Sequence, residues 1–317
     1  MECFSFERTW ITCGSYALIH AAELPETCLL ELENMAGATF GLACQGERYG
    51  YTRMLTPLRD FHAGIDSAAP LWGLELQRYD TVSPDEILDF IGRYPGDRFV
   101  LGPISMVGLW YLPLCSQYKG ADHFIMVQNL DSSRYLVVDS EGVPGIILDL
   151  DQLRSLLQIR DIPEAQGMLT SRRVVSKGPI AAMEERLRFT WGLAGNYLCD
   201  APRLGQGHYG ILECARIVGT VPSAYWSASL QYSLGDLIQR KRMFRMLANN
   251  MNLLPGVSLN PALLELLDCQ IDAAGKAYGM TLRKDCCGCA SQLEQLAEAE
   301  KILADKWKDW LWDDWNQ

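Results

Sequence analysis

The sequence lacks an apolar run long enough to cross a membrane, and it lacks any excess of positive charge. Its 317 residues include 28 Lys and Arg against 39 Asp and Glu, a formal net charge of −11 at pH 7. An acidic chain repels phosphate backbones, so we expect no nucleic-acid partner. The longest apolar runs fall well short of the roughly 20 residues that a membrane span needs, so no membrane association is expected.

Histidine is also scarce, and the chain contains no internal repeat and no low-complexity segment. The four histidines are His20, His62, His123 and His208. Hydrophobic residues make up 49% and charged residues 21% of the chain, which excludes general disorder. The first residues, Met-Glu-Cys-Phe-Ser-Phe-Glu-Arg, lack a basic segment followed by an apolar core, so no secretory signal is expected. We therefore expect a globular, cytoplasmic protein that is long enough for two domains.

Cysteine is present in a number that does not fit a disulfide framework. The chain has eleven cysteines, an odd count, and shows no export signal. We expect most of them to be reduced thiols that pack as small hydrophobic residues. The segment Asp285-Cys286-Cys287-Gly288-Cys289 resembles a metal motif, but no second pair of ligands accompanies it in the sequence. No metal site is therefore expected.

Sequence patterns in the first half predict a mixture of helices and strands. Residues 14–24 read as a helix that ends before Pro25. Ser83-Pro84-Asp85-Glu86 is typical of a capping box, which predicts a helix to about Gly92. Residues 95–97 predict a turn and residues 98–106 a buried strand.

The clearest hairpin signal follows. Residues 123–130 are mostly apolar with β-branched members, residues 131–134 favour a turn, and residues 135–139 predict the returning strand. Further predicted elements are a third strand at 146–148 and a helix at 153–157, capped by Asp149 or Asp151.

The pattern changes near residues 160–180, which predict a linker or an exposed ribbon. Beyond it, apolar residues recur at helical spacing. The predicted helices cover residues 180–199, 207–218, 234–253, 261–279 and 289–312. We therefore expect an α+β protein with an N-terminal domain at residues 1–165 and a mostly α-helical domain at residues 166–317.

Three residues of the first domain combine into a candidate catalytic set. Cys13 stands at the start of a predicted helix, where the helix dipole favours a thiolate. His123 begins one strand of the predicted hairpin and Asp139 ends the other, so antiparallel pairing makes them direct or diagonal neighbours. A carboxylate that orients a histidine, which activates a thiol, is the arrangement of nucleophilic catalysis.

These residues and their order along the chain resemble the papain-like cysteine fold, and most closely the butirosin biosynthesis protein H family. The resemblance covers most of the chain and depends on order and spacing rather than on one motif. The matching segments are Thr12-Cys13-Gly14-Ser15, Phe40-Gly41-Leu42, Val100 to Pro113 with its Tyr-Leu-Pro turn, His123-Phe124, Tyr135 to Asp139, Ser233 to Arg245 and the Trp-rich C-terminal helix.

The resemblance implies a papain-like N-terminal domain with acyltransferase activity. In that family an aminoacyl or peptidyl group moves from a carrier-protein thioester to a cysteine and then to an amine-bearing acceptor. Carried over, Cys13 is the nucleophile, His123 is the base and later the acid, and Asp139 is the orienting group. No cofactor is implied beyond the phosphopantetheine that the carrier protein brings.

This sequence departs from the expected pattern in two places. After Asp139 the family often continues with Pro, whereas this chain reads Asp139-Ser-Glu-Gly. The other departure, from the broader papain-like group, precedes the nucleophile. That group often has a Gln six residues before the nucleophile, as an oxyanion donor, whereas this chain has Glu7. An ionised Glu accepts hydrogen bonds and cannot donate them. The oxyanion is then expected to use backbone N–H groups, such as that of Cys13, or another side chain. We place Glu7 and Tyr111 in the oxyanion or substrate neighbourhood.

Two other functions stay open from the sequence. A thioesterase or a peptidase-like hydrolase can use the same Cys-His-Asp set, because the outcome depends on water exclusion, which the sequence does not show. A non-catalytic binding protein of the same fold is the third alternative.

A basic cluster in the helical half is a candidate docking site for an acidic carrier protein or its phosphopantetheine phosphate. It consists of Arg240, Lys241, Arg242 and Arg245, and its alternative is a solvated helix face. The tryptophans near the C-terminus alternate with aspartates, which favours a core or homodimer face over a membrane contact.

Overall fold

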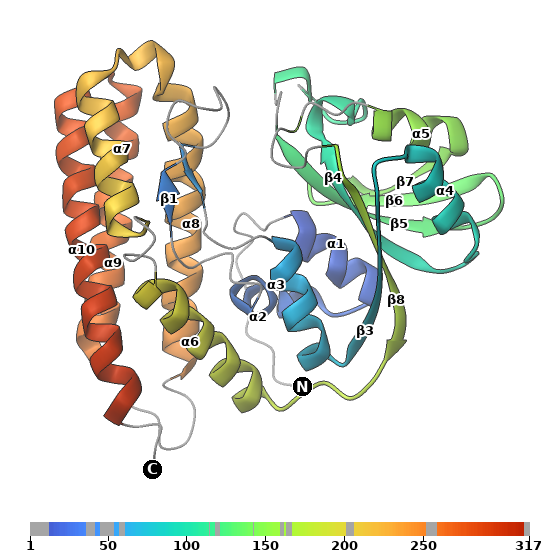
Figure 1. The fold of residues 1–317 in the computed structure, drawn as a ribbon, viewed down its shortest axis with the longest axis horizontal. Coiled ribbons are helices and arrows are strands. Elements are labelled where there is room, and N and C mark those ends of the chain that lie inside the picture. Colours follow the sequence, from blue (N-terminus) through green and yellow to red (C-terminus); the bar gives the residue numbers. More distant parts are fainter. Residues whose placement is uncertain are drawn as a thin grey trace. The chain divides into compact units, whose positions relative to one another are not determined.

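The computed structural model describes residues 13–35, 42–44, 54–56, 61–113, 115–117, 121–141, 143–158, 162, 167–200, 206–251 and 259–313. The chain forms two compact units (Figure 1). One comprises Met1–Leu32 with Ile65–Ala181, and the other comprises Glu33–Gly64 with Ala182–Gln317. The expected boundary at 165/166 is therefore wrong by about one strand, and the helical unit also takes a segment from the first half of the chain.

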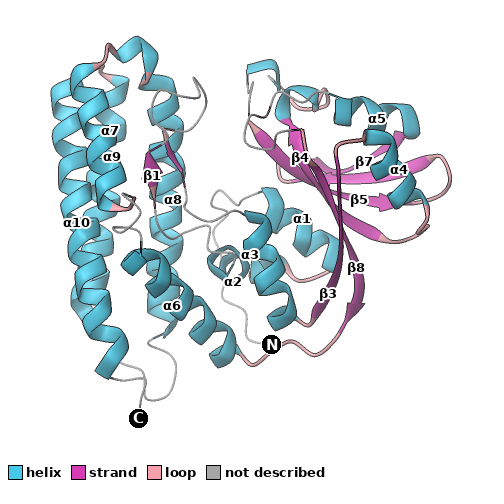
Figure 2. Cartoon of the chain, viewed as in Figure 1, coloured by secondary structure: helices cyan, strands magenta, loops and turns pink. Residues whose placement is uncertain are grey.

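The first unit is built around a six-stranded antiparallel sheet with strand order β3-β8-β4-β5-β6-β7. Its strands are β3 (Leu74–Thr81), β4 (Arg98–Ser105), β5 (Asp122–Asn129), β6 (Arg134–Asp139), β7 (Val143–Asp149) and β8 (Leu169–Lys177). Its helices are α1 (Cys13–Ala22), α4 (Pro84–Gly92) and α5 (Leu150–Gln158), and α2 (Leu29–Met35) and α3 (Phe61–Ala68) cross the unit boundary. In this unit α1 packs against β4 and β5, and α4 and α5 cover the other side of the sheet (Figure 2).

Local capping explains where two of these helices begin. The Ser83 hydroxyl accepts a hydrogen bond from the Glu86 N–H at 3.3 Å, and Pro84 occupies the first helical position of α4, as the sequence predicts. At α5 the Asp149 carboxylate accepts from the Gln152 N–H at 2.8 Å, and the Gln152 side chain accepts from the Asp149 N–H at 2.9 Å. This reciprocal pair identifies Asp149 as the residue that caps α5.

The predicted linker at 160–180 contains an interior strand, so that prediction is wrong. Strand β8 pairs with β3 on one side and β4 on the other. Its Arg172 side chain is fully buried, and its Nε and Nη2 donate to the Asp66 carboxylate at 2.7 and 3.1 Å. The arginines of this segment are typical of a solvent-exposed ribbon, but the Arg172 guanidinium is neutralised by the Asp66 carboxylate inside the unit.

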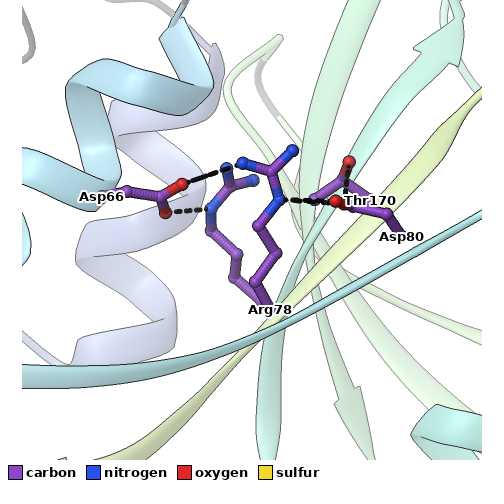
Figure 3. Close-up of polar contacts among 5 residues, drawn as sticks. Asp66, Arg78, Asp80 and Thr170 are labelled. Carbon is purple, nitrogen blue, oxygen red and sulfur yellow. Dashed lines mark hydrogen bonds and ion pairs between the residues drawn. The ribbon is translucent and has the colours of Figure 1, made fainter.

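The arginine network joins α3 to the sheet (Figure 3). Arg78 on β3 donates to Asp66 at 3.0 Å and to Asp80 at 2.8 Å, and the Thr170 hydroxyl donates to Asp80 at 2.7 Å. Burial alone raises the pKa of Asp66, but the hydrogen bonds and charges of Arg172 and Arg78 outweigh it and lower this pKa. The carboxylate therefore stays ionised where it holds two arginines.

The second unit is a set of long helices with one short antiparallel strand pair. Its helices are α6 (Met183–Asp200), α7 (His208–Thr220), α8 (Ser227–Met251), α9 (Pro261–Leu282) and α10 (Cys286–Asp313), which confirms the five predicted helices. Short 3₁₀ helices occur across the chain at Glu26–Cys28, Ala69–Trp72, Met106–Gly108, Cys115–Gln117 and Ser223–Tyr225. Among the described helices, none combines the length and apolarity that a membrane crossing requires.

Strands β1 (Ala43–Cys44) and β2 (Leu55–Thr56) belong to the helical unit because their backbones bond to it. The Leu42 carbonyl accepts from the Gly207 N–H at 2.6 Å, just before α7. The Ser233 hydroxyl on α8 accepts from the backbone N–H groups of Met54 and Leu55 at 2.7 and 3.1 Å. These bonds connect residues more than 160 positions apart, which no local sequence pattern predicts.

A buried ion pair lies among these helices. The Lys241 ammonium on α8 donates to Glu300 on α10 at 2.7 Å, and the Gln270 amide on α9 donates to the same carboxylate at 2.8 Å. All three side chains are buried. The group links three helices through one carboxylate, and therefore fixes their relative positions along their axes.

Removing the carboxylate of this pair should destabilise the protein strongly. We expect Glu300→Ala to lower the free energy of unfolding by about 3–5 kcal/mol, because it leaves the Lys241 ammonium buried and unpaired. Urea unfolding measures this, with Glu298→Ala as the matched control because Glu298 is exposed on the same helix. Adding Lys241→Met to Glu300→Leu should recover most of the loss. Equal effects of Glu300→Ala and Glu298→Ala would contradict the role of the pair.

Candidate active site

The Cys13 thiol lies at the first residue of α1, as the sequence predicts. Within the described part of α1 its backbone N–H has no acceptor, because the first N–H groups of a helix lack intrahelical partners. The Cys13 side chain is partly exposed, whereas the next residues of the helix are buried. The Phe124 backbone N–H donates to the Cys13 sulfur over 3.3 Å. The sulfur therefore combines solvent access with a hydrogen-bond donor that favours negative charge.

The hairpin of β5 and β6 brings His123 and Asp139 together. Met126 pairs with Val138, and continuing this register puts Asp139 opposite Ile125, so that His123 is its diagonal neighbour. The His123 Nε2 and the Asp139 Oδ1 are 2.8 Å apart, and both side chains are buried. The predicted pairing of these two residues is confirmed.

Gly102 on β4 allows β5 to approach at this point. A Cβ atom on Gly102 would lie 2.5 Å from the Phe124 ring and 2.7 Å from the His123 carbonyl oxygen. Both contacts are far shorter than van der Waals distance, so only glycine fits here. The strand that carries the histidine is thus positioned by the absence of a side chain on its neighbour.

The charge state of His123 follows from its surroundings. Burial lowers the pKa of His123, but the charge of Cys13, the hydrogen bonds to Asp139 and Cys13, and the charge of Asp139 outweigh it and raise this pKa well above the ordinary 6.5. A carboxylate can only accept, so the Nε2–H donates to Asp139. The Nδ1 atom is therefore the ring atom that forms the hydrogen bond with Cys13. A histidine with a raised pKa beside a cysteine sulfur is the arrangement that nucleophilic catalysis by cysteine uses.

Asp139 is held by three donors. Besides His123, the Tyr111 hydroxyl donates to Oδ2 at 2.8 Å and the Glu141 backbone N–H donates to Oδ1 at 2.9 Å. Burial raises the pKa of Asp139, but these hydrogen bonds and the His123 charge outweigh it and lower this pKa. Burial beside the carboxylate in turn raises the pKa of Tyr111, which keeps its hydroxyl protonated as a donor.

The structure gives different outcomes for the other expected site residues. Glu7 lies outside the described residues. Tyr111 lies at the site but holds the orienting carboxylate rather than an oxyanion. Sequence reasoning missed the Phe124 N–H as a partner of the sulfur, because every residue except proline has a backbone donor and only the fold selects this one.

The basic cluster in α8 does not form a docking surface as a whole. Arg240 is buried and its Nε donates to Asp236 at 2.8 Å, while Lys241 is buried against Glu300. The Arg245 guanidinium forms an ion pair with Asp268. Only Arg242 is exposed. The prediction that Arg240 and Lys241 contact a carrier protein is therefore wrong, because helix packing uses both charges internally.

The Cys-rich segment at 285–289 starts a helix. The Asp285 carboxylate accepts from the Gly288 N–H at 2.9 Å, which caps α10. A Cβ atom on Gly288 would lie 2.6 Å from the Met280 sulfur, so this glycine permits close packing. Within the ranges that the structure describes, no three His, Cys, Asp or Glu side chains gather as metal ligands.

Comparison with known proteins leaves the activity open. No family model matches the sequence. The chain is 26% identical over 151 residues to the "Uncharacterized protein YobF" of Bacillus subtilis (strain 168), a match that covers 46% of this chain and 48% of that protein. The chain thus spans about half the length of the curated relative it matches. The functional argument therefore depends on the geometry of the site.

The electrostatics of the site predict a raised titration midpoint for His123. In NMR titrations the His123 ring should titrate above 6.5, and Asp139→Asn should lower the midpoint by removing a buried negative charge. Asp122→Asn, an exposed change on the same strand, should leave it unchanged. Since the pKa of His123 is raised in the folded state, the interaction of its ring with Asp139 and Cys13 stabilises the fold fully below pH 6.5. This stabilisation is lost as the pH rises through the pKa of the folded state. A midpoint insensitive to Asp139→Asn would refute the assignment.

Tyr111 should act on the site through Asp139. Tyr111→Phe removes the donor to Oδ2, so the Asp139 pKa should rise and the carboxylate should hold the His123 ring less firmly in one orientation. We expect alkylation of Cys13 by iodoacetamide to slow about fivefold, the effect of roughly 1 kcal/mol. Trp110→Phe is the matched control, because its exposed ring packs against Tyr111 without bonding to Asp139. Equal rates for the two variants would exclude a positioning role.

Proposed function

We propose that the protein is a cysteine-dependent acyltransferase that moves an aminoacyl, peptidyl or other acyl group from a carrier-protein thioester to an amine acceptor. The observation that carries the proposal is the connected set of Cys13, His123 and Asp139, with the sulfur partly exposed and the other two groups buried. The order of the three residues along the chain agrees with the family that the sequence resembles.

The chemistry balances with these residues. The Cys13 thiolate attacks the thioester carbonyl, a carbon–sulfur bond forms, and the carrier thiolate leaves and takes a proton from the His123 imidazolium. The amine then attacks the acyl-Cys13 carbonyl, and neutral His123 accepts the amine proton. The Cys13 thiolate leaves as the amide forms. The acyl enzyme thus divides aminolysis of a thioester into two easier steps.

Hydrogen-bond donors of the site can stabilise the negative charge that develops in these steps. The Cys13 N–H at the start of α1 can stabilise the oxyanion of each tetrahedral intermediate. The Phe124 N–H stabilises the sulfur whenever it carries charge. Asp139 keeps the imidazole ring in one orientation throughout, because three donors fix the carboxylate itself.

A papain-like fold of the first unit is part of this proposal. A helix that begins at the nucleophile and packs against an antiparallel sheet, whose strands supply the base and the orienting carboxylate, supports it. The ten cysteines within the described residues are free thiols, which supports a reducing cytoplasmic location. The carrier protein brings the phosphopantetheine, and no other cofactor takes part in the proposed steps.

The proposal is tested by intact-protein mass spectrometry after mixing the protein with an acyl-loaded carrier protein. We expect an acyl adduct that maps to Cys13 and that a primary amine then removes as an amide. Cys13→Ala should abolish the adduct, and His123→Ala should slow its formation by about 10²–10⁴-fold. Asp139→Asn should have a milder effect.

Cys115→Ala is the matched control, because Cys115 is another partly exposed thiol of the same unit, and this variant should keep full activity. Release of the acyl group as a free acid, at a rate independent of added amine, would identify a thioesterase or hydrolase instead. The absence of any adduct, with the carrier thioester intact, would favour the non-catalytic binding protein.

A further inference from the structure

The helical unit contains four cysteines that converge on one core. Cys214 on α7 and Cys289 on α10 are buried there, and Cys44 on β1 and Cys286 on α10 pack against the same core. Cys44, Cys214 and the two α10 cysteines are far apart in the sequence, so only the fold brings these three positions together. The catalytic steps proposed above use none of them.

Backbone geometry places Cys44 directly on α7. A Cβ atom on Gly210 would lie 3.0 Å from the Cys44 backbone nitrogen and 3.3 Å from the Ala43 Cα, so the two backbones touch at this glycine. The Gly207 N–H bonds to the Leu42 carbonyl at 2.6 Å and fixes the same segment one turn earlier. Cys214 follows Gly210 by four residues, so it lies on the same face of α7, one turn further along.

The two thiols interact directly. Cys44 and Cys214 share a side-chain hydrogen bond, which is the largest cause of the raised pKa of Cys214. Cys44 is partly exposed, and Cys214 is fully buried behind it. An oxidant from solvent therefore reaches Cys44 first, and the nearest partner for an oxidised Cys44 is Cys214.

We propose that Cys44 and Cys214 form a reversible disulfide when the protein meets a peroxide. Hydrogen peroxide transfers one oxygen to the Cys44 sulfur, which gives a sulfenic acid and releases water. The Cys214 sulfur then displaces the hydroxyl group, which leaves as a second water with the Cys214 proton. The sum is two thiols and one peroxide converted to one disulfide and two waters.

The cross-link has a defined structural consequence. It joins β1 to α7 and closes a loop that contains Ile65–Ala181, the longer of the two segments of the first unit. Long loops constrain the unfolded chain most, so oxidation should raise the melting temperature. Because Cys214 is buried, peroxide cannot oxidise it directly, and the reaction depends on Cys44. Only a cysteine beside Cys44 can then complete the disulfide, which selects this pair among the thiols of the chain.

The test uses the full-length Cys13→Ala protein, so that it does not depend on the proposed acyl transfer. The reduced protein is titrated with hydrogen peroxide, the remaining thiols are alkylated, and intact and peptide masses are measured. We expect the loss of two hydrogen atoms, a linked pair of peptides that contain Cys44 and Cys214, and a rise in melting temperature of roughly 5–10 °C that dithiothreitol reverses.

Three variants make the outcome specific. Cys44→Ser should prevent the cross-link, whereas Cys287→Ser, a change at an exposed thiol, should leave it intact. Cys214→Ala should stop oxidation at a Cys44 sulfenic acid that dimedone traps. If Cys214→Ala fails to fold, the Cys44→Ser result alone tests the proposal. The proposal is overturned if Cys44 still alkylates after the exposed Cys287 has been oxidised, or if Cys44 pairs with another thiol.

Discussion

A buried negative charge at Asp139 is the constraint on which the candidate site depends. A carboxylate inside a protein is costly unless donors compensate it, and this one receives the His123 ring, the Tyr111 hydroxyl and the Glu141 N–H. The three donors come from the start of β5, the turn after β4 and the residues after β6. Keeping Asp139 ionised therefore fixes three segments at once. The charge of Cys13, the hydrogen bonds to Asp139 and Cys13 and the charge of Asp139 together raise the pKa of His123.

The molecule repeats this use of buried charge away from the site. Arg172 on β8 forms an ion pair with Asp66 on α3. Lys241 on α8 forms one with Glu300 on α10. In each case a charged side chain, of a type usually exposed to solvent, joins elements that are far apart in the sequence. Such pairs contribute little net stability over apolar packing, but breaking one leaves an uncompensated charge. Such pairs therefore favour the one arrangement of helices and strands in which every buried charge has its partner.

The thiols divide according to their surroundings. Cys13 stands at a helix start with a backbone donor and a cationic ring beside it, which suits covalent catalysis. The hydrogen bond to Cys44 and burial raise the pKa of Cys214, so this sulfur is a poor nucleophile that reacts only with an activated partner beside it. The same residue type thus supports different chemistry in the two units, because dielectric and neighbouring charge decide thiol reactivity.

The sequence by itself determined the features that depend on residues close along the chain. The Ser83 cap, the hairpin that aligns His123 with Asp139, and the helical pattern after residue 180 follow from local periodicity and turn chemistry. Only the tertiary structure decided that β8 enters the sheet interior, that residues 33–64 join the helical unit, and that Tyr111 and the Phe124 N–H complete the site. These depend on long-range pairing and on the neutralisation of buried charge, and neither leaves a periodic signal in one sequence.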